Sequence, residues 1–139
     1  MVLRNLECSS VGDKRFSAFY AHTSFFGKVD SIENIYQSVK RDMNGNKCGK
    51  GKKVDHIIIN GKRLSPSYLT PFYIMLWVKY LDNNKELVTY ADKFDTFTDK
   101  FRGKCINCQA DIIKAYVKNG RNSLMCREDV KDLCSILRG

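Results

Sequence analysis

An apolar stretch in the middle of the chain limits the folds that are open to it. Residues 72–81 read FYIMLWVKYL, apolar almost all round at helical spacing, and a helix without a polar face has to be buried on every side. Thr70 and Pro71 precede it as an N-cap hydroxyl and a proline at the first helical position, which predicts where the helix starts. The longest uninterrupted apolar run, 72–78, is far too short to span a bilayer. We therefore expect a central helix that the rest of the chain surrounds.

The other elements are predicted from periodicity and turn residues. Extended segments are expected at residues 1–7, 24–29, 54–59, 62–64 and 86–91, and further helices at 30–40, 109–117 and 128–137. Asn60-Gly61 is a favoured tight-turn pair, and Asn119-Gly120 is a typical helix end. The chain is therefore predicted to be a single α+β domain over residues 1–139, mainly helical with a few short strands.

The predicted helix 30–40 has two different faces. Its core face is expected to consist of Ile32, Ile35, Tyr36 and Val39. Glu33, Gln37 and Lys40 follow at helical spacing and form a second, polar stripe. A polar stripe of this kind is ordinary on a surface helix, where Asp30 would be the N-cap and Glu33 would support it. The same stripe, just after the aromatic loop 15–20, is also a plausible pocket wall.

The segment 41–53 is rich in glycine, asparagine and lysine, and we expect a loop there. It lacks the G-x-x-x-x-G-K-[ST] spacing, which excludes a P-loop. The loop is either a solvated insertion or a basic segment that helps to hold phosphates. The formal net charge of +9 favours anionic partners such as nucleic acid or nucleotides.

The cysteines give no clear site. Cys105 and Cys108 form a CxxC that is half of a zinc motif, but Cys126 and Cys134 are too far apart for the second half. No signal sequence is recognisable, so we expect a cytoplasmic protein with reduced thiols and no membrane partner. Small buried or half-buried thiols are the favoured interpretation.

Two motifs together resemble a known family. Phe16-Ser17-Ala18-Phe19-Tyr20, followed by the segment 32–40 with the sequence IENIYQSVK, resembles the opening signature of the NADAR superfamily. That signature is an "F/L-S-x-F-Y" loop and a "V-E-x-x-Y/F-Q-x-x-K" helix. The order, spacing and most identities match over roughly the first third of the chain.

The resemblance implies cleavage of N-glycosidic bonds. Bacterial members act on riboflavin-pathway intermediates, and others remove ADP-ribose from guanine. The "W-G…D-G…N-x-L-G" pattern of the riboflavin-type members is absent, with Asn107-Cys108-Gln109-Ala110 in the place of its last part. This departure argues against activity on riboflavin intermediates.

The resemblance also implies a set of site residues. Glu33 is the expected catalytic carboxylate, and either Asp95 or Asp99 is the second acid. The expected substrate-binding residues are Arg15, Ser17, Phe19, Tyr20, Tyr36, Gln37, Lys40, Trp77, Lys79 and Asn107. Trp77 is equally well interpreted as a core residue. The chemistry needs neither metal nor cofactor.

We therefore expect a hydrolase that removes ADP-ribose from guanine in nucleic acid, with the basic surface docking the substrate. It would reverse a toxin-like ADP-ribosyltransferase, as an antitoxin or in phage counter-defence, and act in the host cytoplasm if phage-encoded. Two alternatives stay open: a riboflavin-intermediate N-glycosidase, and a non-catalytic module that binds nucleic acid or ADP-ribose.

Overall fold

The computed structural model describes residues 3–101 and 109–139. In these ranges the helices are α1 (Ile32–Ser38), α2 (Leu69–Asp82), α3 (Lys85–Ala91), α4 (Gln109–Asn119), α5 (Asn122–Met125) and α6 (Glu128–Arg138). The strands are β1 (Asn5–Glu7), β2 (His22–Phe25), β3 (Lys28–Ser31), β4 (Lys40–Arg41), β5 (His56–Ile59), β6 (Lys62–Leu64) and β7 (Thr96–Thr98). Two short 3-10 helices precede β2 and α2, η1 (Lys14–Phe16) and η2 (Pro66–Tyr68). The predicted α+β class is confirmed.

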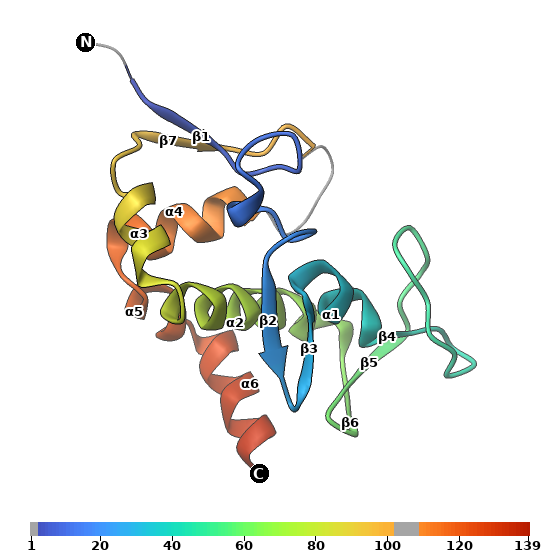
Figure 1. Cartoon of the computed structure of the whole chain (residues 1–139). Helices are drawn as coiled ribbons and strands as arrows, with labels where there is room; N and C mark the ends of the chain where they lie inside the picture. Colours follow the sequence, from blue (N-terminus) through green and yellow to red (C-terminus); the bar gives the residue numbers. More distant parts are fainter. Residues whose placement is uncertain (1–2, 102–108) are drawn as a thin grey trace.

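Helix α2 is the centre of the fold, as its sequence predicts (Figure 1). It packs against α1, α3, α4, α5, α6 and β2. Phe72, Leu76 and Leu81 are completely buried on it, and Trp77 is buried between them. An apolar helix is stable in this position because every face finds another apolar surface.

The strands form three small sheets around this helix. β1 and β7 pair in parallel, with Leu6 opposite Phe97. β2 and β3 form an antiparallel hairpin, and β4, β5 and β6 form an antiparallel sheet in that order. The Asn60-Gly61 turn between β5 and β6 is confirmed, with φ angles of 49° and 80°.

The prediction for residues 86–91 is wrong, because the segment is helix α3 rather than a strand. Val88, Thr89 and Tyr90 favour a strand locally. Leu87 and Ala91, however, lie one helical turn apart and are both buried. Tertiary burial of that helical face therefore outweighs the local propensity.

Two predicted helix starts need correction. The side chain that caps α1 is Ser31, whose Oγ accepts from the Asn34 N–H at 3.1 Å, so Asp30 lies one residue outside the helix. α1 ends at Ser38, and Lys40 belongs to β4. α2 begins at Leu69 directly after η2, so Thr70 is already inside it and is not the N-cap.

One extended segment needs correction, and other expectations hold with adjusted boundaries. Residues 24–29 are predicted to be extended throughout, but the Phe26-Gly27 turn separates the end of β2 from the start of β3. α4 ends before Gly120, whose φ is +89° and whose N–H donates to the Tyr116 carbonyl at 3.0 Å. Val130 and Leu133 of α6 are buried, with Cys134 and Leu137 partly buried beside them.

Two further sequence expectations concern the cysteines and a membrane-spanning helix. Cys105 and Cys108 lie outside the described residues, Cys126 is exposed and Cys134 is partly buried. Within the described ranges, no three His, Cys, Asp or Glu residues gather as a metal site would require. No helix in those ranges is long and apolar enough to cross a membrane.

Candidate functional site

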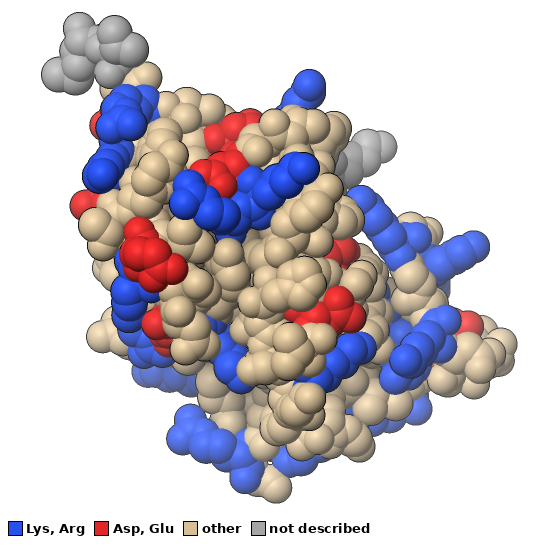
Figure 2. Space-filling view, in the orientation of Figure 1, with Lys and Arg blue, Asp and Glu red and all other residues tan. Residues whose placement is uncertain are grey.

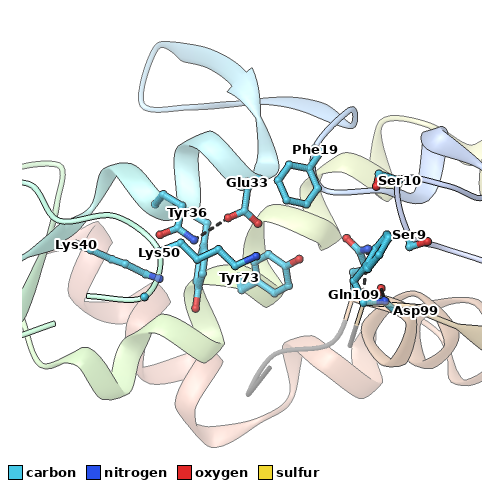
Figure 3. A pocket seen from close by; sticks show the side chains of 13 residues that line it. Ser9, Ser10, Phe19, Glu33, Tyr36, Lys40, Lys50, Tyr73, Asp99 and Gln109 are labelled. Carbon is cyan, nitrogen blue, oxygen red and sulfur yellow. Dashed lines mark hydrogen bonds between the residues drawn. The ribbon is translucent and has the colours of Figure 1, made fainter. Parts of the chain in front are cut away.

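A pocket of about 460 Å³ opens where α1 faces the ends of β1 and β7. One side is formed by Glu33, Tyr36 and Gln37 of α1 and by Lys40 of β4. Phe19 of the aromatic loop, Tyr73 of α2, and Lys50 and Gly51 of the basic loop also line the pocket. Its other side is formed by Ser9, Ser10, Asp99, Phe101 and Gln109. Figure 3 shows Glu33 and Tyr36 on one side and Asp99 and Gln109 on the other. The volume is in the range of small-molecule sites.

The aromatic loop positions Glu33 by capping α1. The N–H groups of Ile32 and Glu33 donate to the carbonyls of Ala21 and Ala18, at 2.8 and 2.9 Å. These are N–H groups of the first helical turn, which have no partner inside a helix. The capping places Phe19, the residue after Ala18, next to the Glu33 side chain (Figure 3).

Gln37 holds the Glu33 carboxylate. Its Nε2 donates to Glu33 Oε2 at 2.7 Å, a hydrogen bond between positions i and i+4 of α1. Gln37 Oε1 is buried and has no hydrogen-bond partner among the described residues. Buried polar atoms are normally paired, so Gln37 retains one acceptor that its contact with Glu33 does not use.

Two lysines bring positive charge to the pocket. Lys40 Nζ lies 4.7 Å from the centre of the Tyr36 ring, and Lys50 Nζ lies 6.0 Å from the centre of the Phe19 ring. Burial lowers the pKa of Lys40, and the nearby Glu33 carboxylate opposes that effect. An anionic ligand group would relieve the cost of keeping this ammonium charged in the pocket.

The floor of the pocket is aromatic. The rings of Tyr36 and Tyr73 are 4.8 Å apart, and Tyr73 is almost fully buried. Burial raises the pKa of Tyr73 far above its ordinary value, so its hydroxyl stays protonated. Flat rings with a protonated hydroxyl suit a ligand that contains a sugar or a base.

Gln109 fastens the opposite wall. Its Oε1 accepts from the Ala18 N–H at 2.8 Å, and its Nε2 donates to the Cys8 carbonyl at 2.8 Å and to Asp99 Oδ2 at 3.1 Å. Asp99 Oδ1 accepts from the Phe101 N–H at 3.0 Å. One buried amide therefore connects the aromatic loop, the end of β1 and the loop after β7.

The structure brings six of the predicted site residues together and separates others. Those that line the pocket are Phe19, Glu33, Tyr36, Gln37, Lys40 and Asp99. Of the two candidate acids, only Asp99 is there, because Asp95 accepts from the Arg4 N–H at 2.8 Å, outside the pocket lining. Asn107 lies outside the described residues.

Five further predicted residues are not in the pocket lining. Trp77 is completely buried in the core, edge-to-face with Tyr80 at 5.5 Å. Arg15 is ion-paired with Asp13 at 2.7 Å. Ser17 is buried in the turn before Phe19, Tyr20 is half-exposed beneath Lys14, and Lys79 is partly buried on α2. The lysines in the lining are Lys40 and Lys50, and neither Arg15 nor Lys79 is among the lining residues.

Some of the residues that line the pocket are not singled out by the sequence. They are Ser9, Ser10, Lys50, Gly51, Tyr73, Phe101 and Gln109. The sequence does suggest a phosphate-holding role for the basic loop, and that loop contains Lys50 and Gly51. The apolar pattern assigns Tyr73 to the core with the rest of α2. Ser9, Phe101 and Gln109 have no local signal, because they meet only through the parallel pairing of β1 with β7.

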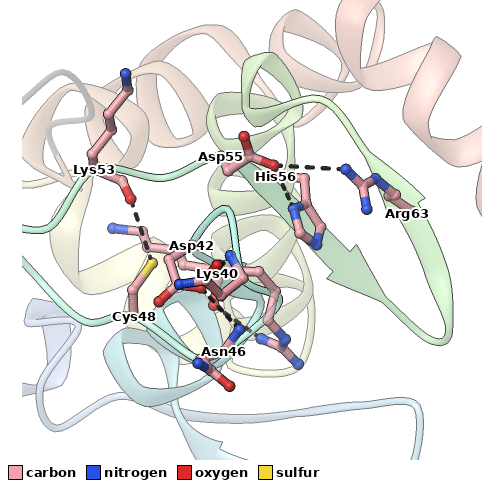
Figure 4. Close-up of polar contacts among 10 residues, drawn as sticks. Lys40, Asp42, Asn46, Cys48, Lys53, Asp55, His56 and Arg63 are labelled. Atoms are coloured by element: carbon pink, nitrogen blue, oxygen red, sulfur yellow. Dashed lines mark hydrogen bonds and ion pairs between the residues drawn. The ribbon is translucent and has the colours of Figure 1, made fainter.

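The basic loop is fixed at its base (Figure 4). Asp42 Oδ1 accepts from the N–H groups of Asn44 and Asn46, at 2.9 and 3.0 Å. The Cys48 N–H donates to the Lys40 carbonyl at 3.2 Å. These contacts hold the loop beside the pocket, where Lys50 is part of the lining.

Comparison with models of known protein families and with curated proteins finds no match for this chain. The site therefore has to be interpreted from its own chemistry. It combines a held carboxylate, two ammonium groups, aromatic rings and a second carboxylate on the facing wall. This set can bind a phosphorylated ribose and stabilise positive charge on its sugar ring.

Proposed function

We propose that the chain is a hydrolase of N-glycosidic bonds that removes ADP-ribose from guanine in nucleic acid. The observation that carries the proposal is the Glu33 carboxylate, held by Gln37 inside a pocket that also contains Lys40 and Lys50. The resemblance of residues 16–20 and 32–40 to the NADAR signature supplies the reaction class.

The chemistry requires a carboxylate beside the sugar. When the bond between ribose C1 and the base nitrogen breaks, its electrons leave with the base and the ribose becomes positively charged at C1. Glu33 would stabilise that charge and accept a proton from the water whose oxygen bonds to C1, and that proton would then pass to the departing base nitrogen, directly or through solvent. The products are free ADP-ribose and the unmodified base.

The other pocket groups suit the rest of the substrate. Lys40 and Lys50 would neutralise the pyrophosphate. Asp99, held by Gln109 and the Phe101 N–H, would accept from ribose hydroxyls. The rings of Phe19, Tyr36 and Tyr73 would enclose the flat base.

The test is release of ADP-ribose from a guanine-ADP-ribosylated single-stranded oligonucleotide. Wild type is compared with Glu33→Gln, which keeps the side-chain volume, and with Asp95→Asn, which removes an acid that does not line the pocket. We expect wild type and Asp95→Asn to release ADP-ribose at similar rates. Glu33→Gln should be slower by about 100-fold or more, the size of a typical acid–base contribution.

Equal rates for wild type and Glu33→Gln would refute the catalytic assignment. No release by wild type, with retained binding of ADP-ribose, would favour the non-catalytic binding module. Turnover of a free ribosylamino-pyrimidine, but not of the oligonucleotide, would favour the riboflavin-intermediate activity instead.

A further inference from the structure

A second groove, of about 310 Å³, lies beside the other face of α1. The tips of two hairpins border it: Phe26 of the β2–β3 turn and the Asn60-Gly61 pair of the β5–β6 turn. Ile35 of α1 and Val39, the residue after the helix, also line it, whereas Glu33 and Gln37 face the first pocket. The short helix therefore separates the two cavities.

The two hairpins have the same kind of turn but different residues. Phe26 and Gly27 have φ angles of 48° and 81°, and Asn60 and Gly61 have 49° and 80°. Both are two-residue turns with positive φ at each central position, as type I′ turns require. Asparagine is favoured at the first position, whereas a bulky phenylalanine is strained there. Phe26 thus occupies a position for which its backbone preference is poor.

The Phe26 ring is exposed and rigidly supported. It is 52% exposed, and it meets Phe25 edge-on with ring centres 4.6 Å apart. Phe25 in turn packs edge-on against Phe72 of the core at 5.1 Å. A supported ring with a free face is the arrangement on which nucleic-acid bases stack.

The groove is positively charged. Lys28, Arg41 and Lys47 line it, and none of its thirteen lining residues is an aspartate or a glutamate. Lys28 and Lys47 form no ion pair with another described residue. The lowest part of the molecule in Figure 2, where the hairpin tips and the C-terminal end of α6 both lie in Figure 1, shows Lys and Arg side chains and no acids. The charge is complementary to a phosphate backbone.

The basic loop connects the groove with the pocket. Lys47 lines the groove and Lys50 lines the Glu33 pocket. The loop therefore contributes one lysine to the lining of each cavity.

We propose that this groove binds single-stranded nucleic acid, with one base stacked on Phe26 and the backbone phosphates on Lys28, Arg41 and Lys47. Continuation of the strand into the Glu33 pocket rests on the proposed function, whereas binding to the groove does not. A single strand fits better than a duplex, because only an unpaired base exposes its face to the ring.

The stacking contact is tested with a short, unmodified, fluorescein-labelled single-stranded oligonucleotide, measured by anisotropy against the full chain. Phe26→Asn removes the ring and supplies a residue that tolerates positive φ, and Phe26→Tyr keeps a ring. We expect Phe26→Asn to weaken binding by about fivefold or more, as loss of one stacked base does. Phe26→Tyr should bind as wild type does, and thermal unfolding checks that both variants fold.

The phosphate contacts are tested through the salt dependence. Lys47→Gln should reduce the slope of log affinity against log salt by about 0.7, the value for one phosphate contact on a single strand. Lys52→Gln removes the same charge from the same loop but at a residue outside the groove lining. This control should leave the slope unchanged.

Wild-type affinity in a folded Phe26→Asn variant would overturn the proposal. Equal competition by polyphosphate and by an unlabelled oligonucleotide would also overturn the proposal, because the surface would then recognise charge without bases. Neither result depends on hydrolysis. If wild type releases no ADP-ribose but oligonucleotide binding still depends on Phe26, the proposed reaction is wrong and the proposed binding surface stands.

Discussion

Lys40 shows how a charged residue in a pocket lining can lower the stability of the folded state. Its ammonium lies over the Tyr36 ring, and burial lowers its pKa below the ordinary value of 10.5. A lowered lysine pKa means that the folded protein binds this proton more weakly than the unfolded chain does. The folded state is therefore penalised while Lys40 is charged, and the penalty fades as the pH rises from the folded pKa towards 10.5.

We predict that Lys40→Met leaves the thermal midpoint at neutral pH unchanged or higher, because it removes a partly buried charge and keeps the alkyl chain. The same change should weaken binding of ADP-ribose by about tenfold or more, the loss expected for one charge-assisted contact. Calorimetric titration and thermal unfolding measure the two effects.

Lys52→Met is the matched control for Lys40→Met, because Lys52 is exposed and does not line the pocket. It should change neither binding nor stability. A clear loss of stability in Lys40→Met would contradict the argument, since the Tyr36 and Glu33 contacts would then outweigh the burial of the charge.

At the level of single residues, the sequence predicts the α1 wall of the pocket but, on the facing wall, only Asp99 as one of two candidate acids. Glu33 and Gln37 are four positions apart on one helix, so their contact is a local property that periodicity reveals. Gln109 contacts Ala18 and Cys8 from far along the chain. No spacing rule reports such a contact, because it depends on how β1, β7 and α4 are packed.

At the level of elements, α3 and the two hairpins show where local signals succeed and fail. The Asn60-Gly61 turn is predicted because its residues suit the turn, and the structure has it. Phe26-Gly27 forms the same turn, but with phenylalanine instead of the favoured asparagine at its first position. For that reason the sequence predicts one extended segment over residues 24–29 and not a hairpin. The prediction of a strand for α3 fails because its β-branched and aromatic residues mask the helical spacing of Leu87 and Ala91.

The strain at Phe26 can be measured separately from the loss of its ring. Phe26→Asn and Phe26→Ala both remove the ring contacts with Phe25, but only asparagine adopts a left-handed backbone readily. We predict that the asparagine variant is more stable than the alanine variant by about 1 kcal/mol in urea unfolding.

Val29 provides the comparison for the Phe26 variants. It is exposed on β3 of the same hairpin and does not have positive φ. There, Val29→Asn should be no more stable than Val29→Ala, since asparagine is depleted in strands. Equal stability of the two Phe26 variants would show that the turn relaxes when the ring is removed.

At the scale of the whole molecule, the sequence predicts the fold class but not how the helices are arranged around α2. The apolar pattern of residues 72–81 predicts the buried central helix, and the mixture of helical and extended patterns predicts the α+β class. The order in which other helices surround α2 depends on long-range polar contacts as well. Asp82 at the end of α2 makes several such contacts, with Tyr116 of α4 and with Arg121 before α5.

These contacts make the stability depend on pH. Burial alone would raise the pKa of Asp82, but hydrogen bonds from Arg121 and Tyr116 hold it below its ordinary value of 3.8. A lowered carboxyl pKa contributes stability that is fully present above the unfolded value and is lost as the pH falls through the folded one. The net charge of +9 rises further as carboxylates are protonated, and self-repulsion then adds to the loss.

We predict that Asp82→Asn lowers the free energy of unfolding by about 1 to 3 kcal/mol at neutral pH, because the variant loses charge-assisted hydrogen bonds that join three helices. The difference from wild type should shrink as the pH falls from the unfolded value of about 4 through the lower pKa of the folded state, where the wild-type carboxyl is itself protonated. Urea unfolding across the acid range gives both profiles.

Asp92→Asn is the control: its carboxylate pairs with Lys118 at 3.2 Å on an exposed surface, so its removal should change the stability by less than about 1 kcal/mol. A constant difference between Asp82→Asn and wild type from neutral to acid pH would mean that Asp82 acts through shape rather than charge, and the acid sensitivity would then have to arise from the net charge alone.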